Sequence, residues 1–137
     1  AGALNTLGAL RAELAKPASV VFVGTFLTRS TFPGLAAYIA SKAALVAHAR
    51  TLAVEFAPLN VRVNVVSPGP TATAIWGTLG LPDEQLEQVA EGVTQRLLPG
   101  HFLESAAVAN VILFQLSQGA RGVYGQDWVV DNGYTLN

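Results

Sequence analysis

The stretch VRVNVVSPG at residues 61–69 carries the clearest structural signal in this sequence. Its valines form a short apolar run, typical of a β-strand buried on both faces of a parallel sheet, and the Pro-Gly pair ends that strand. Two further runs have the same character, SVVFVG at 19–24 and QDWVVDNG at 126–133. We therefore predict three strands, each closed by a turn.

Helical patterns fill the intervals between these strands. Leucines recur at helical spacing in the first segment, and the segment after the first strand is rich in alanine. Strands that alternate with helices are typical of an α/β fold with a parallel sheet. We expect helices at 3–15, 36–56, 82–98 and 105–117, and a loop at 70–81.

The composition excludes several classes of function. The chain has 137 residues, 51% of them hydrophobic, which is enough for one domain with a sizeable core. Its net charge is -1 and its eight Lys and Arg residues are scattered, so we expect neither a nucleic-acid partner nor a membrane partner. With no cysteine and two separated histidines, we expect no metal site and a reducing, cytoplasmic location.

Three polar side chains are predicted to meet at one edge of the sheet. Thr25 directly follows the first strand, Tyr38 comes thirteen residues later, and Lys42 lies one helical turn beyond Tyr38. Ligands of parallel sheets bind at the carboxyl ends of the strands. A hydroxyl, a phenol and an ammonium group next to the Pro68-Gly69 turn suit proton transfer to a carbonyl oxygen.

These segments resemble the short-chain dehydrogenase/reductase family, and the resemblance covers nearly the whole chain. YIASK at 38–42, preceded by PGLAA, is similar to the family's Tyr-x-x-x-Lys signature. RVNVVSPGPTAT at 62–73 is similar to its Asn-x-x-x-Pro-Gly segment, and GVYGQDWVVDNGYT at 122–135 is similar to its last strand. The resemblance implies a three-layer Rossmann-like fold in which residues 1–137 are the C-terminal half of one catalytic domain.

The resemblance also implies a function and a role for individual residues. Tyr38 would be the general acid/base, Lys42 would support its ionised form, and Thr25, in place of the family's usual Ser, would polarise the substrate carbonyl. The implied activity is that of an NAD(P)-dependent oxidoreductase, which moves a hydride between nicotinamide and a small carbonyl or alcohol substrate. The residues expected to contact NAD or NADP are Tyr38, Lys42, Pro68, Gly69, Pro70, Thr71 and Thr73.

The segment from 75 to 98 resembles the family's variable substrate loop. Trp76, Leu79 and Leu81 give this segment an apolar lining, which points to a hydrophobic substrate.

The N-terminal βαβ half of the family fold has no counterpart in this sequence. A Thr-Gly-x-x-x-Gly-x-Gly phosphate loop and an Asn-Asn-Ala-Gly segment are both missing. The first strand would then have a bare edge, which invites association, so we expect the chain to need the missing half. The resemblance further implies a homo-oligomer that pairs the helices at 3–15 and 36–57.

Other interpretations stay open at this point. The chain is alternatively a non-catalytic module that keeps the fold and serves in assembly, or a non-redox lyase or isomerase that uses the same Tyr-Lys pair. Each site residue also has an ordinary structural role. Thr25 would cap a turn, and Tyr38 and Lys42 would be surface side chains. The Pro68-Gly69 pair would only end the strand.

Overall fold

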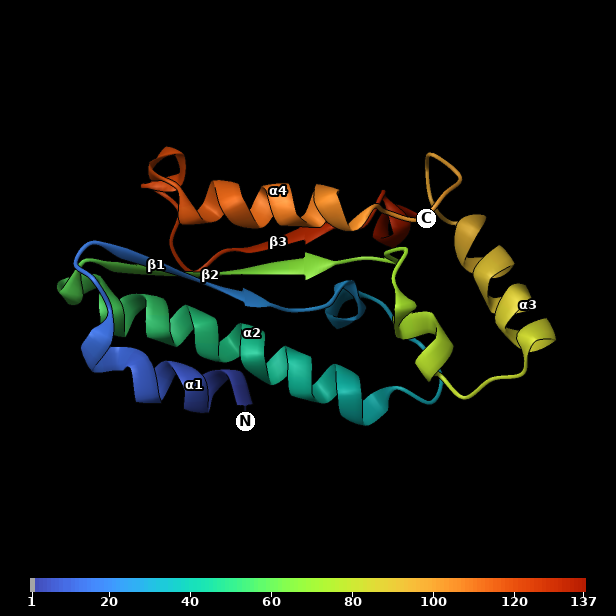
Figure 1. The fold of residues 1–137 in the computed structure, drawn as a ribbon, viewed down its shortest axis with the longest axis horizontal. Coiled ribbons are helices and arrows are strands. Elements are labelled where there is room, and N and C mark those ends of the chain that lie inside the picture. The colour runs from blue at the N-terminus through green and yellow to red at the C-terminus, as the bar shows by residue number, and fades with distance from the viewer. Residues whose placement is uncertain (1) are drawn as a thin grey trace.

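Three parallel strands form the centre of the molecule (Figure 1). The computed structural model describes residues 2–137. The strands are β1 (Ala18–Val23), β2 (Val61–Pro68) and β3 (Asp127–Val130), and they lie in the order β1-β2-β3. β2 is central, and seven of its eight residues are buried because it pairs on both edges and is covered on both faces.

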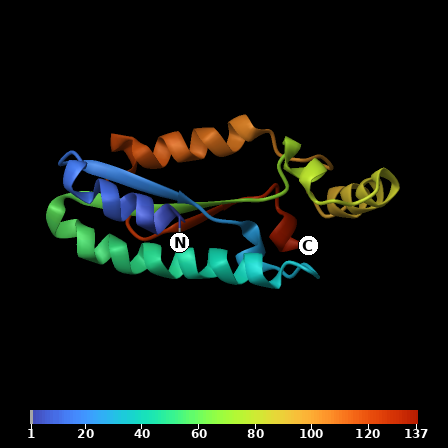
Figure 2. The same cartoon turned by 60° about the horizontal axis from the view of Figure 1, so that its bottom comes forward.

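Helices cover both faces of this sheet. α1 (Gly2–Leu10) and α2 (Ala36–Phe56) lie on one face, and α4 (Ser105–Leu116) lies on the other (Figure 1, Figure 2). α3 (Asp83–Thr94) lies beyond the carboxyl ends of the strands. The helix, sheet and helix layers confirm the predicted three-layer, Rossmann-like α/β fold with a parallel sheet.

Separate apolar cores hold the helices in place. Ala49 and Ala53 of α2 are buried against the valines of β2, and their small side chains let the helix approach the sheet closely. On the other face, Val108 of α4 packs with Val66 of β2. The buried members of a third core, which involves α3, are Val93, Leu97 and Tyr134.

The third strand is shorter than the sequence predicted. It ends at Val130 because the next residues turn back sharply. The Asp131 carboxylate accepts hydrogen bonds from the backbone N–H groups of Gly133 and Thr135, and Asn132 has a positive φ of 49°. A side chain that bonds its own following backbone ends a strand in this way.

Helix ends also differ from the prediction by a few residues. The first helix ends at Leu10, and Arg11–Glu13 continue as a 3-10 turn. The helix predicted for 82–98 covers Asp83–Thr94, and the predicted loop at 70–81 contains a 3-10 turn, η4 (Ala74–Thr78). Such differences are ordinary at helix ends, where hydrogen bonding frays.

β1 and β3 are both less buried than predicted, since none of the four residues of β3 is fully buried. The prediction of burial on both faces is also wrong for β1, because Phe22 is its one buried residue and Val23 is 47% exposed. Within residues 2–137, β1 pairs only with β2, so its outer edge is bare. A bare edge is what the resemblance implied for this strand.

The described part of the chain offers neither a membrane span nor a metal cluster. No helix in residues 2–137 has both the length and the apolar character that crossing a membrane requires. The same residues contain no group of three or more His, Cys, Asp or Glu side chains placed to hold a metal ion.

Replacement of Gly69 by alanine tests the close packing at the end of β2. A Cβ atom at this position would lie 2.5 Å from the Cα of Asp131, and backbone at that distance cannot move aside cheaply. We predict that Gly69→Ala lowers the free energy of unfolding by about 2 kcal/mol, measured by urea denaturation. Gly122→Ala is the matched control, because a Cβ atom at position 122 would extend into open space, with nothing to collide with inside 4 Å. Equal effects of the two variants would contradict the packing argument.

Candidate active site

A cavity of about 500 Å³ lies at the carboxyl ends of β1 and β2. Its wall contains every residue that the sequence analysis assigned to catalysis or cofactor contact. These residues come from the segment after β1, the first turns of α2, the last residue of β2 and the segment that follows it. They are Thr25, Tyr38, Lys42, Pro68, Gly69, Pro70, Thr71 and Thr73.

Thr25 is held at the point where β1 ends. Its side chain is 4% exposed, and it caps η2, the 3-10 turn formed by Phe26–Arg29. The Thr25 Oγ1 atom accepts a long hydrogen bond of 3.4 Å from the backbone N–H of Leu27. Because the hydroxyl is the acceptor in this bond, its own proton can still be donated into the cavity.

Tyr38 and Lys42 project from successive turns at the start of α2. The Lys42 Nζ atom lies 5.9 Å from the centre of the Tyr38 ring and donates a 2.8 Å hydrogen bond to the backbone oxygen of Val23. This bond ties the start of α2 to the end of β1, next to Thr25. The Tyr38 side chain is 43% exposed, so its hydroxyl is accessible to a ligand.

The turn after β2 is fixed by contacts with neighbouring segments. The Gly69 N–H donates a 2.8 Å hydrogen bond to the backbone oxygen of Val130, and the Thr71 hydroxyl donates to the backbone oxygen of Gly69. The close approach of Asp131 explains why position 69 is glycine. The structure therefore supports the strand-ending role of Pro68-Gly69, and cofactor contact there stays a prediction.

Sequence reasoning missed the wall that α4 contributes to this cavity. Ser105, Val108, Ala109 and Ile112 all line it. Because α4 is apolar on most of its surface, periodicity does not indicate which side faces the site. His48 and His101 are both exposed and do not line the cavity.

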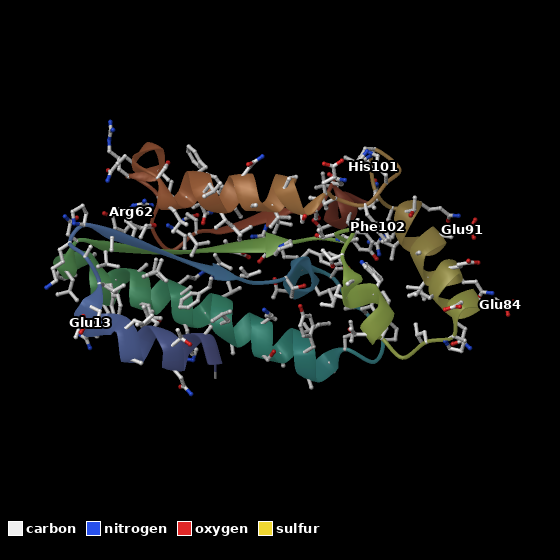
Figure 3. All side chains as sticks on the ribbon, in the orientation of Figure 1. Glu13, Arg62, Glu84, Glu91, His101 and Phe102 are labelled. Carbon is white, nitrogen blue, oxygen red and sulfur yellow. The ribbon has the colours of Figure 1, made fainter. Side chains whose placement is uncertain are left out.

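A second, more apolar cavity of about 530 Å³ adjoins the first and shares Thr73 and Trp76 with it. The Trp76 ring stacks on Phe102 at 5.0 Å, and its N–H donates to the backbone oxygen of Thr71. Phe102 lies near α3. The Glu84 and Glu91 side chains of this helix point away from the sheet (Figure 3). Of the three predicted apolar lining residues, only Trp76 lines either cavity.

For the other two residues, the prediction of an apolar lining is wrong. Leu79 and Leu81 are 44% and 39% exposed and line neither cavity. Their position follows from η4, which turns Trp76 inward and leaves the residues after it at the surface.

Comparison with known proteins identifies relatives of this chain. A family model described as enoyl-(acyl carrier protein) reductase matches residues 1–135. Cyclopentanol dehydrogenase from Comamonas testosteroni is 40% identical over 105 residues, which is 77% of this chain and 40% of the relative. Carbonyl reductase [NADPH] 2 from Sus scrofa is 34% identical over 122 residues, which is 89% of this chain and 48% of the relative.

Solved structures show the same fold. A small-chain dehydrogenase in complex with NADPH superposes with a TM-score of 0.87 at 26% identity, covering 99% of this chain and 59% of the other. A Caenorhabditis elegans short-chain dehydrogenase/reductase with cofactor gives a TM-score of 0.86 at 26% identity, covering 98% of this chain and 52% of the other. The chain belongs to the short-chain dehydrogenase/reductase family. It spans less than half the length of the two curated relatives named above.

Removal of the Lys42 ammonium group tests the link between α2 and β1. Lys42→Met loses the bond to the Val23 carbonyl, and because this bond is partly solvated we predict a loss of about 1 kcal/mol in the free energy of unfolding. Lys16→Met is the control, since Lys16 is exposed on the segment before β1. If the two variants unfold at the same urea concentration, the bond does not hold α2 to β1.

Proposed function

We propose that this chain forms the catalytic part of an NAD(P)-dependent oxidoreductase that interconverts a carbonyl group and an alcohol. The observation that carries the proposal is the cavity at the ends of β1 and β2, where Thr25, Tyr38 and Lys42 share one wall. Relatives named as dehydrogenases and reductases support the same reaction class.

Tyr38, Lys42 and Thr25 have separate roles in the proposed proton transfer. In the reductive direction, the Tyr38 hydroxyl gives its proton to the substrate oxygen, and in the oxidative direction the Tyr38 oxygen takes that proton back. The positive charge of Lys42 stabilises the phenolate that remains after proton transfer. The Thr25 hydroxyl donates a hydrogen bond to the same substrate oxygen, where negative charge develops in the transition state.

The residues at the cavity fit a nicotinamide nucleotide. When bound, NAD or NADP would supply or accept the hydride at its nicotinamide ring. An ammonium group has three donors, and the Val23 carbonyl uses one of those on Lys42, so the others can bind ribose hydroxyls together with Tyr38. Pro68, Gly69, Pro70, Thr71 and Thr73 would lie along the cofactor, because they continue the same wall.

The apolar neighbouring cavity supports a hydrophobic substrate. Trp76 separates this cavity from the one that contains Tyr38, and Phe102 stacks behind it. A small carbonyl or alcohol compound with an apolar body would place its oxygen near Tyr38 and its body against Trp76.

The proposal includes an assembly that covers the exposed parts of the fold. The bare outer edge of β1 fits a strand from the family's N-terminal half. α2 exposes Ala43, Ala44 and Ala47, and small residues at these positions allow another helix to approach closely. We propose a homo-oligomer paired through the helices at 3–15 and 36–57, located in the cytoplasm.

The two alternative functions can be distinguished by how the protein treats NADPH and its substrate. A non-catalytic assembly module would neither bind nor oxidise NADPH. A non-redox lyase or isomerase would convert its substrate with no change in nicotinamide absorbance. The dehydrogenase and reductase names of the relatives favour neither alternative.

Replacement of Tyr38 by phenylalanine tests the assignment of the acid/base. In the natural polypeptide that carries this sequence, we predict that Tyr38→Phe lowers kcat for ketone reduction by about 10²–10⁴-fold, because the proton donor is lost. NADPH oxidation with cyclopentanone and a panel of larger cyclic ketones is the assay. Dissociation constants for NADPH should change by less than about threefold, since one of several contacts is removed.

Tyr124→Phe is the matched control for this experiment. Tyr124 is 41% exposed, close to the 43% of Tyr38, and lies outside the cavity. Its replacement should leave kcat unchanged. Retention of full activity by Tyr38→Phe would remove Tyr38 from the mechanism.

A further inference from the structure

A buried carboxylate in β3 connects the segments that form the active site. Asp127 is the first residue of β3 and precedes three apolar residues, and its side chain is 4% exposed. One of its oxygens accepts a hydrogen bond from the Ser67 hydroxyl of β2. The other lies 3.3 Å from an Arg29 guanidinium nitrogen, which also donates a 3.0 Å bond to the Asp127 backbone oxygen. A buried charge needs such partners, and these come from two other segments.

Both partners of Asp127 are linked to segments that flank Thr25. Arg29 is the last residue of η2, the turn that begins immediately after Thr25. The Ser67 side chain packs against Gly24, the residue immediately before Thr25. A Cβ atom on Gly24 would lie 2.5 Å from the Ser67 hydroxyl oxygen. Asp127 thus fixes the chain on both sides of Thr25.

The Thr25 hydroxyl needs this support. Its own bond to the Leu27 N–H is 3.4 Å long, and a bond of that length restrains a side chain weakly. A hydrogen-bond donor for a transition state must stay within about 0.5 Å of its productive position. The contacts of Asp127 with Arg29 and Ser67 supply the restraint that the local bond lacks.

We propose that Arg29 and Asp127 are positioning residues for Thr25. They hold the strand end and η2 in the arrangement that aims the Thr25 hydroxyl at the substrate oxygen. The inference rests on the proposed function, in which Thr25 donates to that oxygen. The Arg29 side chain is 50% exposed, so water can replace part of its interaction with Asp127, and Asp127 keeps the hydrogen bond from Ser67. We therefore expect removal of the guanidinium group to affect turnover more than folding.

The first test removes the guanidinium group from the natural polypeptide that carries this sequence. We predict that Arg29→Met lowers kcat for ketone reduction about tenfold and leaves KM for NADPH within about twofold, because misaligned catalytic groups slow the chemical step. Arg29→Lys keeps one donor and should recover most of the loss. Arg121→Met, at another exposed arginine, is the control and should leave kcat and KM unchanged.

A double-mutant cycle shows whether Arg29 acts through Thr25. Thr25→Val alone should lower kcat by about 10²-fold, as expected for loss of one donor to a developing oxyanion. In the Thr25→Val background, Arg29→Met should lower kcat by less than about twofold, because there is no hydroxyl left to position. Melting temperatures should stay within about 3 °C of each parent.

Each other outcome overturns the inference. If Arg29→Met lowers kcat by the same factor with and without the Thr25 hydroxyl, Arg29 does not act through Thr25. If Arg29→Met leaves kcat unchanged while Tyr38→Phe and Thr25→Val lower it, the positioning role fails and the proposed function stands. If neither Tyr38→Phe nor Thr25→Val lowers kcat, the proposed function fails, and the positioning role fails with it.

Discussion

The parallel pairing of β2 with β1 and β3 is the constraint on which the site depends. Because β2 runs alongside both neighbours in the same direction, all three strands end at one edge of the sheet. The polar segments that follow β1 and β2 are thereby brought together, although Thr25 and Thr71 are far apart in the sequence. The four buried valines of β2 supply much of the apolar contact that maintains this pairing.

Close backbone contacts refine this arrangement at the strand ends. Gly24 lies against Ser67 and Gly69 lies against Asp131, at distances where a methyl group would collide. The Lys42 ammonium group then joins α2 to β1 through the Val23 carbonyl. These contacts leave a cavity beside closely packed strand ends, and close packing helps to keep a proton donor and a polarising hydroxyl in fixed positions.

Most of the fold could be predicted from the sequence, and so could the part of the site whose residues lie close together in the chain. Apolar runs located the strands, and the four-residue spacing of Tyr38 and Lys42 placed both on one side of a helix. The contacts of Asp127 could not be predicted, because they depend on the register that sets Val65 opposite Asp127. A charged residue at the start of an apolar strand was the available signal. The inward orientation of Trp76 in η4 could not be predicted either, because it depends on tertiary packing.

Hydride transfer from nicotinamide to a carbonyl carbon is the central claim about this cavity, and isotope tracing tests it most directly. The natural polypeptide carrying this sequence would be incubated with cyclic ketones and NADPH that carries deuterium at the transferred position of nicotinamide C4. We expect one deuterium on the former carbonyl carbon of the alcohol, together with a proton from solvent on its oxygen. Conversion of the ketone with no deuterium in the product, or no conversion of any ketone and no binding of NADPH, would contradict the proposed hydride transfer.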